Sequence, residues 1–141
     1  IGKLQTNKVK YAISLFDYIH SLDNLRLAEK ISTEQIKQKK RVKIFIQVNI
    51  ADENQKNGIE VSELENFYKT CTVKLGLDIV GLMCLPPEAL DATPFFLKIK
   101  NLKDRLNIKD LSIGMSNDYL IALKYDSTFL RIGSKIFGKR S

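Results

Sequence analysis

Hydrophobic and polar positions alternate along several short runs of the chain, and the clearest run is VKIFIQVNI at 42–50. A strand places successive side chains on opposite faces of a sheet. One face of this run carries Ile44, Ile46, Val48 and Ile50, and the other carries Phe45, Gln47 and Asn49. The pattern predicts a barrel strand with helices over its outer face and a mixed interior face. Asn49 is expected to point inward at the carboxyl end of this strand.

Similar apolar runs predict further strands, and apolar residues at helical spacing predict helices between them. The predicted strands are 18–22, 42–50, 77–85, 111–113 and 129–132, preceded by a strand end at Ile1–Gly2. Helices are predicted at 3–16, after Asp23 over Leu27, Ala28 and Ile31, at 62–75, 93–106 and 118–125, with a short one at the C-terminus. The buried face of the first helix is expected to include Val9, Ile13 and Phe16, that of the second Leu27, Ala28 and Ile31, and that of the helix at 93–106 Phe96, Ile99 and Leu102. Repeated strand–turn–helix units are typical of an α/β fold of the (β/α)8 TIM-type barrel class.

Three local signals predict where these elements end. Asp23 is expected to be the N-cap of the second helix. Ser62 and Glu65 have the spacing of a capping box ahead of the helix at 62–75. Pro86 and Pro87 should stop the strand at 77–85, because proline has no amide hydrogen to donate.

The length of the chain limits how much of a barrel it can form. A complete barrel of this type has about 250 residues and rarely fewer than about 200, whereas this chain has 141 residues and begins at Ile1. We therefore expect 1–141 to be the C-terminal part of one barrel domain, with about five strand–helix units and the first strands missing. Such a fragment should be an open arc that leaves Phe45, Met83 and Phe129 on an uncovered interior. The missing N-terminal segment of the barrel is its expected partner.

Composition narrows the function classes. No apolar run approaches the length of a membrane span, and no charged-then-apolar signal segment opens the chain. The expectation is a globular cytoplasmic chain with no membrane contact. Cys71 and Cys84 lack metal-ligand spacing and His20 has no partner, so no metal site is expected. Both cysteines are expected to be buried or half-buried thiols, and His20 is expected to be structural rather than catalytic.

The formal net charge is +7, and lysines are densest at 37–43. A basic run of this kind can contact nucleic acid, but no aromatic residues are interleaved with it and no binding motif accompanies it. A solvated helix end is the favoured interpretation, and no nucleic-acid partner is expected.

The candidate chemistry lies in the last two predicted strand ends. Gly114 and Gly133 allow the backbone to approach a ligand closely. Ser116 and Ser134 can cap a following helix and also offer a hydroxyl. Turns after the last two strands of a parallel barrel are neighbours, and their N–H groups can bind one anion. We therefore expect Ser116, Gly133 and Ser134 to surround a phosphate site.

Arg131 is the second candidate. The alternation of the last strand places Phe129, Arg131 and Gly133 on the inward face. A buried charge without a partner is expensive, and the expected inward neighbours Gln47, Asn49 and Ser112 are neutral. Two alternatives remain open on spacing alone. Arg131 either forms a structural ion pair with a carboxylate or donates to a ligand acceptor.

Six motifs carry a family resemblance. They are IGKLQTNK at the start, HSLD, IQVNI with NGIE, GLMCLPP, SIGMSND and RIGSKIFG. In this order and at similar intervals they resemble the pyridoxal phosphate homeostasis protein family over essentially the whole chain. The resemblance implies a barrel similar to the N-terminal domain of alanine racemase, with pyridoxal 5'-phosphate at its C-terminal mouth.

Carried over to this sequence, the resemblance implies that Ser116 and the backbone around Gly133 and Ser134 hold the phosphate. It also implies that Arg131 faces the pyridine nitrogen of the cofactor, and Met115 and Asn49 are expected to line the same site. A guanidinium has only donors, so the ring nitrogen opposite it must accept and stay unprotonated. The cofactor is then a weak electron sink.

The chain departs from the family pattern at one place. The resemblance puts the lysine that forms the Schiff base on the first strand, whereas this chain starts at what resembles the end of the third. The expected function is binding and buffering of pyridoxal phosphate in its homeostasis, without enzymatic turnover. The alternatives are a fold-type III amino-acid racemase or decarboxylase, a sugar-phosphate enzyme with the same phosphate loops, and a nucleic-acid-binding module.

Overall fold

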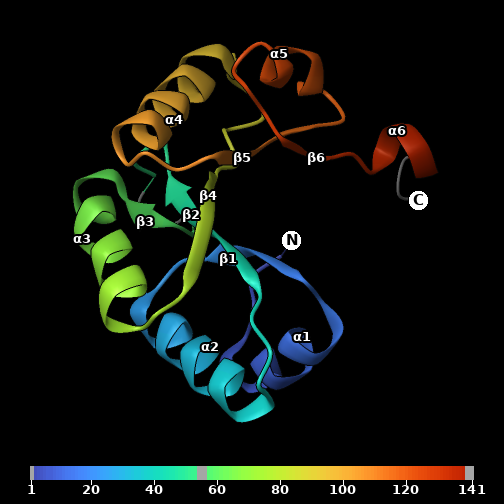
Figure 1. The fold of residues 1–141 in the computed structure, drawn as a ribbon. Coiled ribbons are helices and arrows are strands. Elements are labelled where there is room, and N and C mark those ends of the chain that lie inside the picture. Colours follow the sequence, from blue (N-terminus) through green and yellow to red (C-terminus); the bar gives the residue numbers. More distant parts are fainter. Residues whose placement is uncertain (1, 54–56, 139–141) are drawn as a thin grey trace.

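The computed structural model describes residues 2–53 and 57–138. Its strands are β1 (Tyr18–Leu22), β2 (Lys43–Asn49), β3 (Ile59–Glu60), β4 (Asp78–Met83), β5 (Asp110–Met115) and β6 (Phe129–Arg131). Its helices are η1 (Thr6–Lys8), α1 (Val9–Leu15), α2 (Leu25–Gln38), η2 (Val61–Glu63), α3 (Leu64–Lys69), η3 (Thr70–Lys74), α4 (Thr93–Arg105), α5 (Tyr119–Leu123) and α6 (Ser134–Phe137). The alternation of strands and helices agrees with the predicted α/β class (Figure 1).

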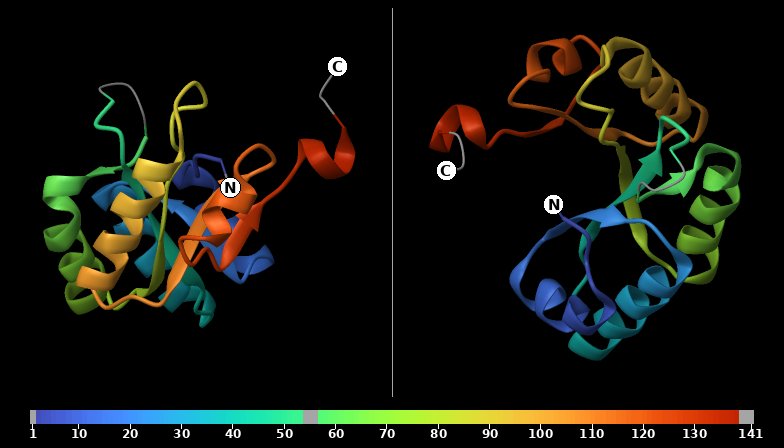
Figure 2. Two further views of the ribbon diagram at one scale, coloured as in Figure 1. Left: turned by 90° about the horizontal axis from the view of Figure 1, so that it is seen from above. Right: turned by 180° about the vertical axis from the view of Figure 1, so that it is seen from behind.

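The sheet is parallel and curved. Its strand order is β1-β2-β4-β5-β6, and the short β3 pairs only with β2. Helices cover the convex side, so the described chain forms a C-shaped arc seen from behind in Figure 2. The arc is the expected fragment of a TIM-type barrel, with β1 and β6 at its two ends and α6 extending beyond β6. In a parallel barrel the carboxyl ends of the strands share one mouth.

The predicted helix faces form the core under the sheet. Leu27, Ala28 and Ile31 of α2 are buried, as are Phe96, Ile99 and Leu102 of α4. They pack against the outer face of the sheet, where Ile44, Ile46 and Val48 of β2 are also buried. Full burial of such a side chain contributes about 1.5–3 kcal/mol. The strand alternation therefore identified the outer face of the sheet, and the helical spacing identified the helix faces that pack on it.

The inner face of the arc is filled by aromatic rings. Phe45 of β2 lies 5.2 Å from Phe129 of β6 between ring centroids, and Tyr18 of β1 lies 5.1 Å from Phe129. Phe45 and Met83 are fully buried, and Phe129 is half-buried. The expectation that these three residues lie on an uncovered interior is therefore wrong for Phe45 and Met83. Rings from both ends of the arc meet over Phe45, which is fully buried, while Tyr18 and Phe129 remain half-buried.

One predicted helix cap is shifted by a residue. Asn24, not Asp23, is the N-cap of α2, and its Oδ1 accepts from the Leu27 backbone N–H at 2.9 Å. Asp23 instead accepts from the Asn24 side-chain amide at 2.7 Å. Asn24 has the extended backbone of an N-cap residue, so its side chain reaches the first helical turn.

The predicted capping box at Ser62 and Glu65 does not form. The segment begins with the 3-10 turn η2, whose N-cap is Glu60 and has no side-chain cap hydrogen bond. It continues as α3 and ends in η3, which is a π-helix. Ser62 lies inside this first turn rather than ahead of it, so the box geometry is lost.

Phe16 is the one residue predicted to be buried on α1 that is not. It is 57% exposed, whereas Val9 and Ile13 are fully buried. The reason is that α1 ends at Leu15 and Phe16 has an extended backbone, which turns it off the helical face. The predicted strands differ from the observed ones by at most two residues at any end. Gly2 belongs to no strand, and Ile1 lies outside the described residues.

Both cysteines are buried free thiols, as predicted. Burial raises the pKa of Cys71 and of Cys84 to about 12, so both are protonated at neutral pH. The lysine-rich run 37–43 is largely exposed. Within it, Lys40 donates to the carbonyls of Ser14 and Phe16, which ties the end of α2 to α1. This agrees with a solvated helix end.

Candidate cofactor site

The turns after β5 and β6 converge, as predicted. The Ser116 hydroxyl oxygen accepts hydrogen bonds from the backbone N–H groups of Gly133 and Lys135, each at 3.3 Å. Ser116 is buried, whereas Gly133, Ser134 and Lys135 are exposed at the mouth of the arc. One hydroxyl and the N–H groups at the start of α6 thus lie within hydrogen-bond reach of each other.

The predicted capping roles of the two serines are wrong. The N-cap of α5 is Asp118 and that of α6 is Gly133, and neither helix has a side-chain cap hydrogen bond. Ser116 does not cap α5, the helix that follows its own turn, because its hydroxyl accepts instead from N–H groups at the start of α6. Ser134 is the first residue of α6 rather than its cap.

The turn after β5 depends on Gly114. Its φ is +98°, and a Cβ there would lie 2.7 Å from the Ala122 Cβ and 2.9 Å from a Leu130 methyl carbon. Asp118 closes the same turn, since its Oδ1 accepts from the Met115 backbone N–H at 2.6 Å. Glycine therefore lets α5 lie close against β5 and fixes where Ser116 emerges.

Met115 is the last residue of β5. Its Cα pairs with that of Arg131 in the register of β5 and β6. It also lines a cavity of about 210 Å³ between the loop after β4 and the start of α5. The structure thus brings Met115 beside Arg131.

Arg131 is buried, as predicted, and its partners are neutral. One terminal nitrogen, Nη1, donates to the Ser112 carbonyl at 2.5 Å and to the Ser112 hydroxyl at 2.7 Å, and Nη2 donates to the Cys84 carbonyl at 2.9 Å. Within residues 2–53 and 57–138 no carboxylate is bonded to it, which removes the ion-pair alternative for this part of the chain. Burial lowers the pKa of Arg131, but a guanidinium stays charged at neutral pH.

The Nε atom of Arg131 is the unsatisfied group of the site. It is buried and has no hydrogen-bond partner in the described structure. A buried donor left unpaired costs about 1–3 kcal/mol. An acceptor supplied by a ligand would remove this cost, so the second alternative for Arg131 fits the geometry.

His20 is joined to the same cluster, which the sequence did not indicate. Its Nδ1 lies 2.8 Å from the Ser112 hydroxyl oxygen, 92 positions away in the chain. Its ring stacks on Phe45 with 4.3 Å between centroids. Burial, and then the charge of Arg131, lower the pKa of His20 to about 4, so the ring is neutral at neutral pH. The signals in the sequence are the position of His20 at the exit of its strand, where barrel ligands bind, and the expected inward position of Ser112.

Asn49 is placed differently from its expectation as a site residue. Its amide donates to the Glu53 carbonyl at 3.0 Å and to Glu60 Oε1 at 3.1 Å, and its carbonyl oxygen accepts from the Glu53 N–H at 3.2 Å. It therefore holds the ends of the loop between β2 and β3 together. No hydrogen bond of the described residues joins it to Ser116 or Arg131, and its cofactor contact stays a prediction.

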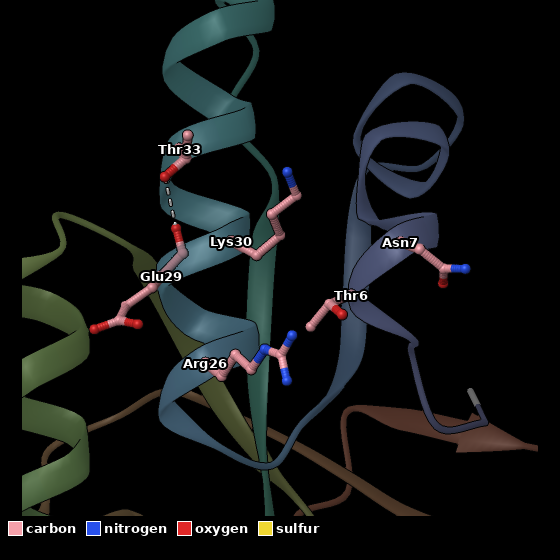
Figure 3. A pocket seen from close by; sticks show the side chains of 6 residues that line it. All are labelled: Thr6, Asn7, Arg26, Glu29, Lys30 and Thr33. Carbon is pink, nitrogen blue, oxygen red and sulfur yellow. Dashed lines mark hydrogen bonds between the residues drawn. The ribbon is translucent and has the colours of Figure 1, made fainter.

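A wider pocket lies on the outer helical layer. It has a volume of about 510 Å³ and is lined by Thr6, Asn7, Arg26, Glu29, Lys30 and Thr33. Figure 3 shows these side chains projecting from η1 and α2, with Thr33 donating to the Glu29 carbonyl. Lys30 is already paired with Glu34 at 3.0 Å. The lining is of mixed charge, and the unsatisfied Arg131 Nε lies elsewhere.

The described ranges contain neither a metal-ligand cluster nor a membrane-spanning helix. Residues 2–53 and 57–138 hold no group of three His, Cys, Asp or Glu side chains that could ligate a metal ion. None of the helices described there is long and apolar enough to cross a membrane.

The curved parallel sheet and its outer helices define part of a (β/α)8 barrel, and the Ser116 turn and the buried Arg131 lie at the carboxyl ends of its strands. The model of the family described as alanine racemase, N-terminal domain, matches residues 1–141. The chain belongs to this family.

Curated relatives carry a more specific name. A pyridoxal phosphate homeostasis protein of Aquifex aeolicus (strain VF5) is 36% identical over 149 residues, which cover 99% of this chain and 65% of the relative. One from Escherichia coli (strain K12) is 36% identical over 148 residues, covering 99% of this chain and 63% of that protein. The chain thus spans a little under two thirds of the length of these relatives.

Solved structures agree on the fold. PipY of Synechococcus elongatus PCC7942, solved without PLP, superimposes with a TM-score of 0.90 at 29% identity and covers 98% of this chain and 69% of its own. The same protein with PLP bound gives 0.86 at 29% identity, with 98% and 68% coverage. Alanine racemase of Clostridium difficile 630 gives 0.74 at 12% identity, covering 99% and 39%, which is a likeness of fold alone.

Proposed function

We propose that this chain forms the phosphate- and ring-nitrogen-binding side of a pyridoxal 5'-phosphate site, in a protein that binds and buffers the cofactor without turning over a substrate. The names of the Aquifex and Escherichia coli relatives and the PLP-bound PipY structure support the choice of cofactor. Cytoplasmic residence is part of this proposal. The observation that carries it is the buried, unpartnered Nε of Arg131.

The donor set at Arg131 fits a pyridine nitrogen. A guanidinium can only donate, and no described carboxylate competes for it. A neutral ring nitrogen offers one lone pair, which a remaining guanidinium hydrogen can meet. Arg131 would hold that nitrogen unprotonated, and bound pyridoxal phosphate would then supply a reactive aldehyde with weak electron-withdrawing power.

The mouth of the arc fits the phosphate. The N–H groups of Gly133 and Lys135 both donate to the Ser116 hydroxyl oxygen, so these three groups converge on one region. A Cβ at Gly133 would meet no atom within 4 Å, which leaves room beside the backbone. Convergent N–H groups of this kind bind phosphate oxygens. Met115 would lie between the phosphate and Arg131.

Proton-transfer groups near Arg131 are unsuited to turnover at neutral pH. His20 has a pKa of about 4 and its Nδ1 is occupied by Ser112. Cys84 has a pKa of about 12. An efficient general acid or base has a pKa near the working pH. This favours a binding role over the second candidate, a racemase or decarboxylase, which the family model and the likeness of fold support.

The proposal assigns the covalent anchor to another part of the barrel. The family resemblance puts the Schiff-base lysine on a strand that precedes these residues, and we propose that this segment packs against the arc beside β1. The chain alone would then bind the cofactor through Ser116 and Arg131 without a covalent bond.

The test uses the completed chain, defined as residues 1–141 joined to the segment of the Aquifex relative that the resemblance places before residue 1. Titration with pyridoxal phosphate, followed by absorbance, should give saturable binding. We expect Ser116→Ala to weaken it roughly 10- to 100-fold, because a hydrogen bond to a charged group contributes about 1.5–3 kcal/mol. Arg131→Gln should weaken it less and leave competition by inorganic phosphate unchanged.

The same titration distinguishes the second candidate. Incubation of the loaded protein with L-alanine, D-alanine and a panel of amino acids should leave each of them unconverted over many hours. Sustained racemisation or decarboxylation would overturn the binding role. Absence of saturable cofactor binding would overturn the site assignment itself.

A further inference from the structure

We infer that Ser112 and His20 are positioning residues for Arg131: they hold its guanidinium through one continuous hydrogen-bond chain and leave its Nε–H for the ligand. The inference rests on the proposed function, since it names how that site is oriented. It concerns Ser112, which contacts Arg131, and His20, which contacts Ser112.

The first step is the anchoring of the guanidinium by two adjacent strands. Three of its five N–H hydrogens are taken by the carbonyl and hydroxyl of Ser112 on β5 and by the Cys84 carbonyl just after β4. Acceptors on two neighbouring strands fix the plane of the group. Nε–H is left without an acceptor in the described structure.

The second step is the direction of each hydrogen bond. Arg131 has no acceptor, so the Ser112 oxygen must accept from Nη1. The hydroxyl then has one hydrogen to give, and His20 Nδ1 lies 2.8 Å away. If that hydrogen goes to Nδ1, His20 carries its own hydrogen on Nε2. The opposite assignment would direct two N–H donors at one oxygen and leave the hydroxyl hydrogen unused.

The third step is the rigidity of the histidine. Its ring stacks on Phe45, meets the edge of Phe129 at 5.4 Å between centroids and lies 6.2 Å from Tyr18. β1 and β5 are not neighbours in the sheet, so the bond from His20 to Ser112 crosses the interior of the arc. The aromatic cluster therefore fixes the acceptor, and the acceptor fixes the Ser112 hydroxyl.

The fourth step is the charge balance around the ligand. Among the described residues, His20 contacts Tyr18, Phe45, Ser112 and Phe129, which are uncharged, and the charge of Arg131 acts on its ring. A neutral imidazole accepts a hydrogen bond from the Ser112 hydroxyl. An imidazolium would instead donate to that hydroxyl, which reverses this hydrogen bond, and its charge would repel Arg131. The ring nitrogen of the ligand thus faces the single positive charge of the Arg131 guanidinium, which is held in one orientation.

The test compares three variants of the completed chain. His20→Phe keeps a ring for stacking on Phe45 but removes the acceptor, and His20→Asn keeps an acceptor near the position of Nδ1. Ser112→Ala removes the hydroxyl. We expect His20→Phe and Ser112→Ala to lower pyridoxal phosphate affinity about 3- to 10-fold, the range expected for one lost hydrogen bond. His20→Asn should restore affinity to within about twofold.

Inorganic phosphate is the matched probe, because it uses the Ser116 mouth and not Arg131. Its affinity should change less than twofold in all three variants. A parallel loss of phosphate affinity would show general damage and overturn the positioning role. Equal cofactor affinity in His20→Phe and the parent chain would overturn it as well.

A second readout does not depend on cofactor binding. This chain has one histidine, so the ¹⁵N signals that vanish in His20→Asn identify its ring. We expect Nδ1 unprotonated and Nε2 protonated at pH 7, with the tautomer changed in Ser112→Ala. A protonated Nδ1 would overturn the inference even if the cofactor binds. Loss of all cofactor binding with the expected tautomer would overturn the proposed function while supporting the hydrogen-bond chain.

Discussion

Gly114→Ala is the substitution whose effect the structure determines most sharply. Position 114 has a φ of +98°, which costs an L-residue about 1–2 kcal/mol. The new methyl group would lie 2.7 Å from the Ala122 Cβ and 3.2 Å from the Tyr119 Cα. Overpacking of this kind costs about 1–3 kcal/mol. The sum is roughly 2–5 kcal/mol, a large part of the 5–15 kcal/mol that stabilises a typical domain.

The assay is urea unfolding of the completed chain, followed by far-UV circular dichroism. Gly133→Ala is the matched control, because its φ is not positive and its new methyl group would meet no atom within 4 Å. We expect the control to change the free energy of unfolding by less than about 0.5 kcal/mol. Gly114→Ala should strongly lower the urea concentration at the unfolding midpoint, while the dependence of the free energy of unfolding on urea concentration stays unchanged. Equal effects of the two substitutions would refute the close packing of α5 on β5.

Three further predictions concern stability. Asn24→Ala should lower the free energy of unfolding by about 1 kcal/mol, because it removes the N-cap of α2. Asp23→Ala should lower it less, and urea midpoints of the two variants measure the difference. A larger loss in Asp23→Ala would identify Asp23 as the cap. The pKa of His20 in the folded chain, about 4, lies below its ordinary value of 6.5. The unfolded chain therefore takes up a proton more readily, so the stability that neutral His20 contributes is complete above pH 6.5 and is lost as pH falls toward 4. His20→Phe should flatten that part of the pH–stability curve, and an unchanged curve would contradict the depressed pKa. The 141-residue chain alone should dimerise or aggregate through β1 and β6 and become a compact monomer when the preceding segment is added. A monomer with a sharp melt, unaffected by the segment, would contradict this.

Elements with a regular period could be predicted from the sequence. The alternation at 42–50 identified β2 and both of its faces, and helical spacing identified the buried side of α4. The convergence of Ser116 and Gly133 followed from the adjacency of the last two strands. These features depend on local pattern or on the general geometry of parallel barrels.

The remaining features depend on distances that only the folded chain sets. His20 reaches Ser112 across the interior, and Phe45 is covered by a ring from β6. No spacing along the chain encodes either contact. Local sequence predicts that the Ser116 hydroxyl caps α5, the next helix in the chain. In the structure it accepts instead from the N–H groups of Gly133 and Lys135 in the neighbouring turn. Phe45 is buried because His20 of β1 and Phe129 of β6 pack on its ring, and both are distant from it in the sequence.

The most direct test of the central claim is the ¹⁵N chemical shift of the ring nitrogen in labelled pyridoxal phosphate bound to the completed chain. The account predicts an unprotonated nitrogen between pH 6 and 8, because the facing group is the Arg131 guanidinium, which can only donate. Arg131→Glu, which places a carboxyl group there, should move the shift toward the protonated form. A protonated ring nitrogen in the parent chain would contradict the account.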